Sequence, residues 1–567
     1  MKESYDAIVI GTGFGGAVAA CRLAQAGLKV GVIERGRRYP MQGFPRDPAN
    51  GWLWPVDQGL FDIRMLGRGI TVQAAGLGGG SLVYSNVHLR APQFAFESGW
   101  PAGYSRAMLE PYYDLVAYML DIAPITSARF RALPPKTRVM ERAARQLGRA
   151  EKFCYPNLAV DFHEPGQLHT NKFGVEQQGC TYCGECTLGC NVHAKNTLDL
   201  NYLALAQRYG ADITTLCEVS RIERLEDGYK VFFGDHGAQG ATGSSQARAV
   251  FVCAGAVNST ELLLRCRDEF KTLPKLSGAL GHGCSANGDI FAFAFATKEA
   301  FEPSDGPIIT TALLAEEGAG SARSWFVVEE GGYAKELRAL TQVMDRGASL
   351  TNNRVALASL TALARRAFVR PKTRWAQLLA ELSRRGLKVP LIVMGALSKR
   401  TTPSNGADDT AVFLIMGYDH PTGILELSPI GHRLRGTWDV ARDLHLYRSE
   451  QKLSAELAKA MGARLRQNPF SERLRYVTTV HCLGGCVMAD QAGQGVTDAE
   501  GEVHGYPGLY VLDGASLPAS TGVNPSSTIA AVAERNIERA IRKLAGHPYW
   551  QAPEMAAAPK IKDPMTS

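Results

Sequence analysis

Residues 5–36, YDAIVIGTGFGGAVAACRLAQAGLKVGVIERG, constrain the fold of this chain more than any other stretch. The apolar run 7–10 predicts a buried parallel strand. Gly11, Gly13 and Gly16 then give the spacing G-x-G-x-x-G, which permits a tight turn, close approach of the backbone to a pyrophosphate, and close helix–sheet packing. A helix follows, and Glu34 ends the second strand, where a carboxylate can bind a ribose diol. The stretch therefore predicts an α/β domain of the dinucleotide-binding Rossmann type.

Two remote segments favour FAD over NAD as the dinucleotide. They are AAGLGGGSLVYSNV at 74–87 and GYPGLYVLDGASLPASTGVNPSSTIAAVAERN at 505–536. In the second segment an apolar strand should bring Asp513 and Gly514 to the carboxyl end of the sheet, and a helix should open after Asn524-Pro525. A single mononucleotide-binding fold does not need these pieces, whereas a long, tightly held FAD does.

The same segments resemble a known family. The motif HCLGGC at 481–486, with the segment from Gly508 that follows it, is similar to the C-terminal part of cholesterol oxidases, which belong to the glucose–methanol–choline (GMC) oxidoreductases. The loop GLGGGSLVYSN at 76–86 resembles the flavin-contacting loop of that family. The resemblance is specific in these FAD-binding segments and weak between about residues 290 and 470, where substrate choice would be made.

The resemblance implies FAD-dependent oxidation of an alcohol, with hydride passing from the carbinol carbon to flavin N5. It places His481 and Asn524 at the catalytic positions. A neutral imidazole can accept or orient the alcohol proton, and an amide can fix the substrate oxygen. Asn524 before Pro525 is also a good helix N-cap, and both roles could hold together. The expected cofactor-binding residues are Gly11, Gly13, Phe14, Gly15, Gly16, Glu34, Arg35, Gly78, Gly79, Ser81, Asn86, Val219, Asp513, Gly514, Asn524 and Pro525.

The sequence departs from the cholesterol-oxidase pattern in two places. Cys482 stands where those enzymes carry proline, and the stretch expected to hold their active-site glutamate has Asp408 and Asp409 instead. Either aspartate could replace the glutamate, or both could be loop residues. Sterol specificity is therefore not implied.

Four cysteines form a ferredoxin-like run. Cys180, Cys183, Cys186 and Cys190 have the spacing C-x2-C-x2-C-x3-C, although Asn191 replaces the usual following proline. The leading interpretation is a [4Fe–4S] or [3Fe–4S] cluster that divides the electron pair of reduced FAD for a one-electron acceptor such as a cytochrome or quinone. A zinc knot, a purely structural cluster, and reduced or disulfide-bonded structural cysteines are the alternatives. With a cluster, a dehydrogenase is favoured over an enzyme that reduces O2.

The net charge of +7 is concentrated in one segment. Residues 335–400 hold fourteen Lys and Arg against three acidic residues, interleaved with apolar ones. This basic helical insert could lie on an anionic membrane surface or could be a solvated cover of the substrate domain. No nucleic-acid-binding motif is apparent. Because the first strand should start by Tyr5, no signal peptide is expected, which predicts a cytoplasmic protein, possibly peripheral to the inner face of the membrane.

A chain of 567 residues should form more than one domain. We expect an FAD-binding domain from 1–95, 172–290 and 475–546, interleaved with an α+β substrate domain from 96–171 and 291–474, and a tail at 547–567. The predicted substrate is a hydrophobic alcohol, sterol-like or long-chain. Alternatives are a sugar or polyol dehydrogenase of the same family, a flavin-dependent isomerase or lyase, and a non-catalytic electron-transfer module.

Overall fold

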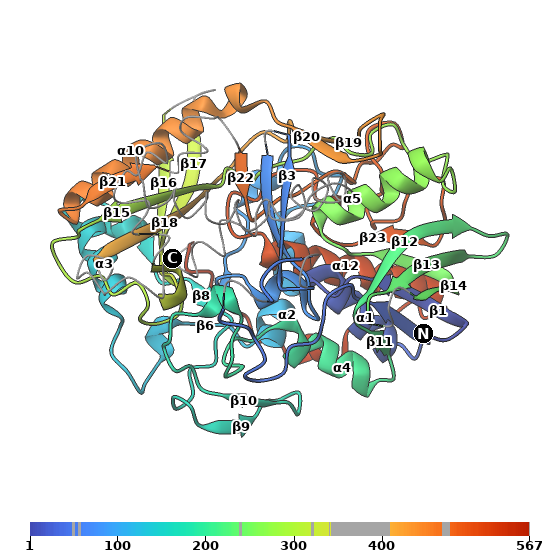
Figure 1. Ribbon diagram of the computed structural model, residues 1–567, viewed down its shortest axis with the longest axis horizontal. Helices are drawn as coiled ribbons and strands as arrows, with labels where there is room; N and C mark the ends of the chain where they lie inside the picture. Colours follow the sequence, from blue (N-terminus) through green and yellow to red (C-terminus); the bar gives the residue numbers. More distant parts are fainter. Residues whose placement is uncertain are drawn as a thin grey trace, which may run out of the picture.

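The computed structural model describes residues 1–47, 51–54, 58–67, 69–237, 241–318, 323–338, 341, 409–467 and 477–565. Most of the predicted basic insert 335–400, and Asp408, lie outside these residues. Figure 1 shows two sheets at opposite ends of the molecule, with the C-terminal helix α12 (Ser526–Leu544) beside the sheet that holds the N-terminal strand.

A seven-stranded sheet confirms the predicted Rossmann-type core. Its spatial order is β11 (Asp212–Thr214), β2 (Val30–Ile33), β1 (Ser4–Ile10), β14 (Ala241–Val252), β13 (Tyr229–Asp235) and β12 (Cys217–Arg224), with β23 (Leu509–Val511) beside the end of β14. β1 runs parallel to both β2 and β14. Ala7 and Val9 point into one hydrophobic core and Ile8 and Ile10 into another, as the two-residue period of a strand buried on both faces requires.

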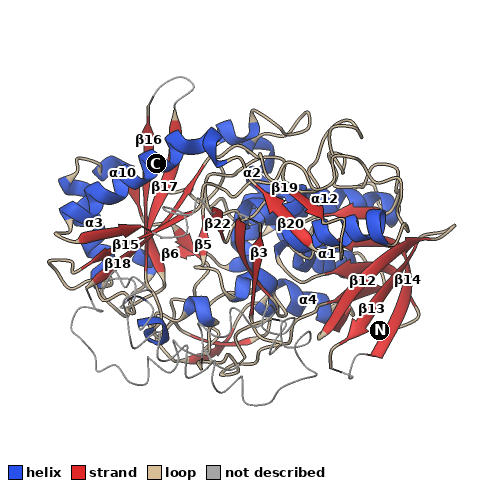
Figure 2. Cartoon of the chain, turned by 45° about the horizontal axis from the view of Figure 1, so that its top comes forward, coloured by secondary structure: helices blue, strands red, loops and turns tan. Residues whose placement is uncertain are grey.

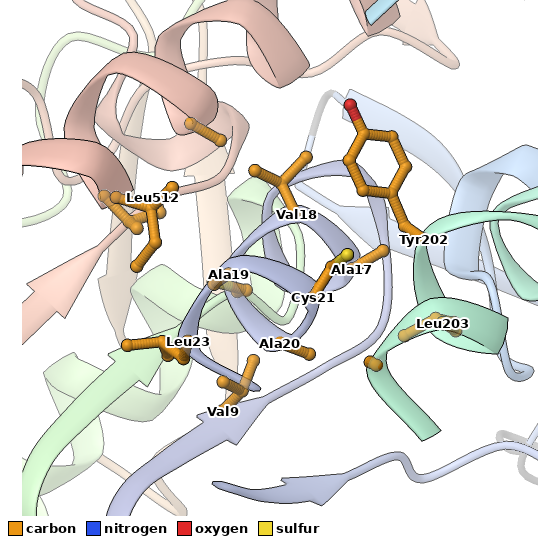
Figure 3. Packing of buried hydrophobic residues seen from close by; sticks show 14 of the residues in the cluster. Val9, Ala17, Val18, Ala19, Ala20, Cys21, Leu23, Tyr202, Leu203 and Leu512 are labelled. Carbon is orange, nitrogen blue, oxygen red and sulfur yellow. The ribbon is translucent and has the colours of Figure 1, made fainter. Parts of the chain in front are cut away.

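Helices cover both faces of this sheet. α1 (Phe14–Gln25), α4 (Tyr202–Arg208) and α12 pack on one face, α5 (Ala256–Leu264) packs on the other, and α2 (Arg106–Leu120) packs on α12. Small residues of α1 let it approach its neighbours closely (Figure 3). Arg22 on α1 forms a fully buried ion pair of 2.7 Å with Glu534 on α12, and the Tyr202 hydroxyl donates to the same carboxylate at 2.7 Å. One charge cluster therefore joins the three helices.

A second, antiparallel sheet has six strands. Their order is β21 (Arg464–Gln467), β15 (Ile290–Phe295), β18 (Thr410–Gly417), β17 (Ser324–Gly331), β16 (Ile309–Glu317) and β7 (Phe153–Cys154). α3 (Pro135–Gln146) and α10 (Leu444–Ala460) cover one face and share its core (Figure 2). Both sheets take strands from separated parts of the sequence, so the chain interleaves them; the exact domain limits stay a prediction.

Short elements complete the described chain. They are the sheet of β3 (Phe61–Leu66), β4 (Gly69–Ala74) and β22 (Val477–Thr479), the sheet of β5 (Val87–His88), β6 (Ala123–Pro124) and β8 (Asn157–Leu158), and the pairs β9 (Leu168–Thr170) with β10 (Glu176–Gln178) and β19 (Ile424–Leu427) with β20 (Leu434–Thr437). Within the described ranges, no helix combines the length and the apolar character needed to cross a bilayer.

Glu450 is a buried carboxyl on α10 without a partner. It is fully buried, and neither carboxylate oxygen has a hydrogen bond among the described residues. Burial, followed by the nearby Asp289, Asp419 and Asp443, raises the pKa of Glu450 well above its ordinary value. The folded protein therefore favours the neutral, protonated form of this side chain.

We expect Glu450→Gln to stabilise the protein increasingly as pH rises. The unfolded pKa is about 4.3. The pKa of Glu450 is higher in the folded protein. The stabilising contribution of the bound proton is therefore complete below the unfolded pKa and is lost as pH rises through the folded pKa. Glutamine has no proton to lose. The variant should therefore gain thermal stability over the wild type at pH 8 and show little gain at pH 5. Glu456→Gln, on the exposed side of the same helix, is the control; an equal gain for Glu450→Gln at both pH values would contradict the buried-proton argument.

Candidate active site

The glycine turn is shaped mainly by protein packing, with one open position. A Cβ on Gly11, Gly15 or Gly16 would lie 2.4, 1.9 or 2.1 Å from a backbone oxygen. A Cβ on Gly13, which precedes α1, would meet no atom of the described residues within 4 Å, whereas a Cβ on Gly79 would lie 2.6 Å from the Gly13 Cα. The second glycine-rich loop therefore rests directly on the turn, and the space beside Gly13 is open to a ligand.

Several predicted cofactor residues fasten loops at this edge of the sheet. The Glu34 carboxylate accepts from the Thr12 hydroxyl at 2.6 Å and from the Gly36 N–H at 2.8 Å. The Asp513 carboxylate accepts from the Gly255 N–H at 2.7 Å and from the Ser259 hydroxyl at 2.6 Å. The remaining positions are as follows: Arg35 pairs with Asp62, Ser81 bonds Gly78 and Leu198, Phe14 packs edge-on against Tyr84, Gly514 lies against Leu483, and Val219 lies on β12 against the second core.

The start of α12 contacts the segment that follows the second glycine loop. The Ser526 hydroxyl donates to the Val87 carbonyl at 3.3 Å, and His88 Nδ1 lies 2.8 Å from the Ser527 hydroxyl. Asn86, immediately before, is fully buried, and neither atom of its amide has a protein partner. An orphaned buried amide is costly unless a bound group satisfies it. Asn86 therefore points to a ligand between these segments.

Asn524 does not cap α12. The N-cap position is Pro525, with no side-chain cap, so the capping interpretation of Asn524 is wrong. Its amide nitrogen donates to Glu329 Oε2 at 3.2 Å, while Asn524 Oδ1 is buried and has no partner among the described residues. The oxygen that would have to accept from the first-turn N–H groups of α12 therefore makes no such bond.

His481 is oriented by Asp289. His481 Nδ1 lies 2.8 Å from Asp289 Oδ1, while the Thr479 hydroxyl and the Val480 N–H donate to Asp289 Oδ2 at 2.9 Å each. A carboxylate at Nδ1 selects the tautomer that carries its proton there and leaves a lone pair on Nε2. The imidazole is therefore prepared to accept a proton at Nε2.

The turn 287–289 holds in place the two segments that carry His481 and Asn524. Two residues before Asp289, the Asn287 side chain donates to the Val523 carbonyl at 2.9 Å, and its Oδ1 accepts from the Thr521 and Gly522 N–H groups at 3.0 Å each. Within the turn 287–289, the Asn287 side chain thus fixes the loop that leads into Asn524, and the Asp289 side chain fixes the strand end that leads into His481.

Glu329 is the carboxyl that the sequence reasoning missed. It is fully buried on β17, with Oε1 unpartnered, and burial raises its pKa well above the ordinary value, with Glu330 and Asp289 adding to the effect and the Asn524 hydrogen bond opposing it. Asp409, which could have replaced the glutamate or been a loop residue, lies in a turn just before β18, where its carbonyl accepts from the Thr297 N–H. Two glutamates inside the apolar strand SWFVVEEG were the available signal.

These positions fit a bound flavin. Unpartnered polar atoms of Asn86, Asn524 and Glu329 and the free Nε2 of His481 belong to segments that contact one another, next to the open glycine turn. The first-turn N–H groups of α12 lie in the same region and favour negative charge. The structure therefore brings together most of the site residues expected from the sequence and adds Asp289 and Glu329.

The four clustered cysteines line one small pocket, together with Val160, Val192 and Lys195. All twelve cysteines of the chain are free thiols, so no disulfide joins them. Lys195 is buried and donates to the carbonyls of Leu82, Tyr84 and Cys186 at 3.0, 2.8 and 2.8 Å. One ammonium group thus connects the cysteine loop to the second glycine-rich loop.

The chain was compared with known proteins. Family models of the GMC oxidoreductases match residues 5–266 and residues 439–533. Cholesterol oxidase of Acinetobacter baumannii is 27% identical over 94% of this chain and 93% of its own. Paromamine 6'-oxidase of Streptomyces fradiae is 25% identical over 94% and 90%. The solved structure of a fungal aryl-alcohol oxidase shares the fold, with a TM-score of 0.58 at 14% identity, covering 96% of this chain and 100% of its own.

The two family matches together span well over half of the chain and contain the glycine turn, His481 and Asn524. The protein therefore belongs to the GMC oxidoreductase family and is an FAD-dependent enzyme that oxidises alcohols.

Proposed function

We propose that this enzyme oxidises a hydrophobic alcohol of sterol-like or long-chain character. The observation that carries the proposal is a largely buried row of residues on the face of the second sheet that lies opposite α3 and α10. Ala312, Glu329, Leu414 and Phe291 lie in register on four neighbouring strands. The row is apolar except for Glu329, which binds Asn524. An apolar surface with one polar side chain suits a ligand that is hydrophobic except for its hydroxyl group.

The side chains divide the chemistry as follows. His481 Nε2 accepts the hydroxyl proton, and Asp289 holds the imidazole in the required tautomer and stabilises it once protonated. Asn524 and Glu329 fix the substrate oxygen, because a carboxyl with a raised pKa can donate a hydrogen bond. Gly13, Gly79, Asn86 and the first turn of α12 would hold FAD, which supplies a two-electron acceptor when bound.

A sugar or polyol is the second candidate substrate, because one relative is a paromamine 6'-oxidase. Such a ligand would need several buried hydrogen-bond partners. The row around Glu329 offers one, which favours the hydrophobic alcohol. Product formation without any electron acceptor would instead indicate an isomerase or lyase. Rapid electron exchange with a partner protein and no turnover of any alcohol would indicate an electron-transfer module.

His481→Ala and Asn524→Ala should each slow anaerobic bleaching of the flavin by a sterol or long-chain alcohol by about 10²–10⁴-fold. The reason is the loss of the proton acceptor in the first variant and of the oxygen-positioning amide in the second. Stopped-flow absorbance measures the rate, and flavin released on denaturation measures the bound FAD, which should be unchanged.

His504→Gln is the matched control, since that imidazole bonds the Ala489 carbonyl and not the candidate site. Normal bleaching in both test variants would exclude the two residues from the chemistry. Faster bleaching with glucose than with sterols or fatty alcohols would exclude the proposed substrate class, and absence of flavin would exclude the cofactor.

We further propose that the cysteine pocket holds an iron–sulfur cluster, which takes up and passes on single electrons when bound. Among the described residues, no three cysteine sulfurs lie within 4.8 Å of one another. A single Zn²⁺ with bonds of about 2.3 Å needs its sulfurs about 3.8 Å apart. In a cluster each thiolate can bind a different iron, so wider spacing is suitable. The arrangement is therefore compatible with a cluster, and the proposal rests on the ferredoxin-like spacing of the four cysteines.

Lys195 gives independent support for an anionic occupant. None of the described ion pairs includes this buried ammonium, whose three hydrogen bonds go to carbonyls. A buried cation without a counter-ion is costly. A cluster held by thiolates carries net negative charge and would compensate it. Because Lys195 also bonds the second glycine-rich loop, a cluster there would lie close to the flavin segment and favour a one-electron acceptor over O2.

Cys186→Ser should remove most of the iron, whereas Lys195→Met should keep the iron and lower the cluster's midpoint potential, because a nearby positive charge favours the reduced, more negative state. Iron analysis and electron-spin-resonance redox titration of anaerobically purified protein measure the two effects. Cys154→Ser, at a half-buried cysteine outside the loop, is the control. Iron-free wild-type protein, or an unchanged potential in Lys195→Met, would count against this arrangement.

Peripheral membrane contact through residues 335–400 is proposed from their charge alone, since most of the segment lies outside the described residues. The protein should co-sediment with phosphatidylserine vesicles at low salt and release them as salt rises, because attraction to an anionic surface is screened. Neutral phosphatidylcholine vesicles are the control. Absent or salt-independent binding would refute the contact.

A further inference from the structure

Asp161 lies between two parts of the cysteine loop. Its N–H donates to the Ala194 carbonyl at 2.7 Å, and its carbonyl accepts from the Cys180 N–H at 2.9 Å. The backbone of this one residue therefore joins the beginning and the end of the loop. Its side chain points away from those bonds and takes no part in the cysteine pocket.

The Asp161 carboxylate gathers two imidazoles. Oδ1 lies 2.6 Å from His163 Nδ1, and Oδ2 lies 2.8 Å from His169 Nε2. The two rings are 4.5 Å apart between centroids. The carboxylate is almost fully buried, whereas the His163 ring is two-thirds exposed. Within the described chain, these three side chains form a set of nitrogen and oxygen atoms that all lie within 4.8 Å of one another.

The second nitrogen of His169 favours a cation between the rings. His169 Nδ1 lies 3.4 Å from the Gln167 carbonyl, which can only accept a hydrogen bond. With Nδ1 directed to that carbonyl, Nε2 is the nitrogen that faces the Asp161 carboxylate and could bind a cation together with it. Metal-bound histidines commonly have this arrangement, with the other ring N–H directed to a backbone carbonyl.

We propose that Asp161, His163 and His169 bind one divalent transition-metal ion of the zinc type. Imidazole and carboxylate suit Zn²⁺, whereas the nearby thiolates suit iron–sulfur chemistry, so the two sites would take different occupants. Ligand bonds of about 2.0–2.2 Å in a tetrahedral site place neighbouring ligand atoms about 3.3–3.6 Å apart. The present separations of 2.6 and 2.8 Å need to open by less than about 1 Å, which the exposed His163 ring permits.

The ion would fasten the segment 161–169 to the cysteine loop. Gly166 N–H donates to the Gly179 carbonyl at 3.0 Å, and β9, which carries His169, pairs with β10 just before Cys180. A bound ion would link Asp161, His163 and His169 within this segment. It would therefore stiffen the outer support of the cysteine pocket without contributing a ligand to it.

The test uses the full-length holoenzyme after dialysis against a mild chelator. Zn²⁺ binding is measured by equilibrium dialysis with elemental analysis, and Co²⁺ binding by visible spectroscopy. One Zn²⁺ per chain is expected, and the Co²⁺ form should show ligand-field bands without thiolate-to-metal charge transfer. His163→Ala and His169→Ala should each weaken Zn²⁺ binding by at least about 100-fold, since removing a direct ligand exceeds the effect of an outer partner.

Cys183→Ser and His236→Ala are the matched controls, and both should keep the affinity. The first removes a thiolate of the neighbouring pocket, and the second removes an imidazole that faces a single carboxylate, Glu218, at 3.1 Å. Because the His163 ring is mostly exposed, its loss should leave the fold intact, and the circular dichroism spectrum checks this. No Zn²⁺ binding by the wild type, equal affinity in His163→Ala, or a thiolate charge-transfer band that disappears in Cys183→Ser would overturn the proposal.

Discussion

The buried turn 287–289 is the constraint on which the candidate active site depends. Asn287 has a left-handed backbone, with φ of 56°, which asparagine tolerates better than most residues. Its side chain holds the loop before Asn524, and Asp289 holds the strand end before His481. The two segments come from positions about 190 and 235 residues further along the chain. Because buried polar groups are expensive to leave unpaired, a shift of this turn would disturb both segments together.

The buried carboxyls around this turn fall into two environments. Asp289 accepts hydrogen bonds from three groups, which suits a charged orienting group. Glu329 accepts one amide hydrogen bond and Glu450 accepts none among the described residues, and burial raises the pKa of both. A neutral Glu329 beside Asn524 can hold a substrate hydroxyl without competing for its proton at the imidazole. The different roles of these carboxyl groups follow from the number of hydrogen bonds that each one accepts.

The sequence predicts those parts of the structure that depend on local spacing. The strand, glycine turn and helix of residues 5–25 follow from hydrophobic period and backbone geometry, and all three were confirmed. Glu329 and Asp289 could not be found in this way, because their roles depend on pairing across strands and on contacts nearly 200 residues apart. The Asn524 cap was wrong because a local rule places the residue before the helix but not its side-chain oxygen, which makes no bond to the first turn, while the amide nitrogen donates to a glutamate 195 residues away.

The cysteine loop shows how local spacing and distant support act together. Spacing alone brings four thiols near one another, but it does not fix the loop, since short flexible segments lose entropy when they close around a metal. Here the fold has already ordered the loop. Asp161 bonds both of its ends, and Lys195 ties it to the carbonyls of Leu82 and Tyr84. Ligands that are ordered before binding lose less entropy when an occupant arrives. The Lys195 bonds also fix the cysteine loop against the second glycine-rich segment. The position of any electron carrier bound by the loop would therefore be set by the folded protein before the carrier binds.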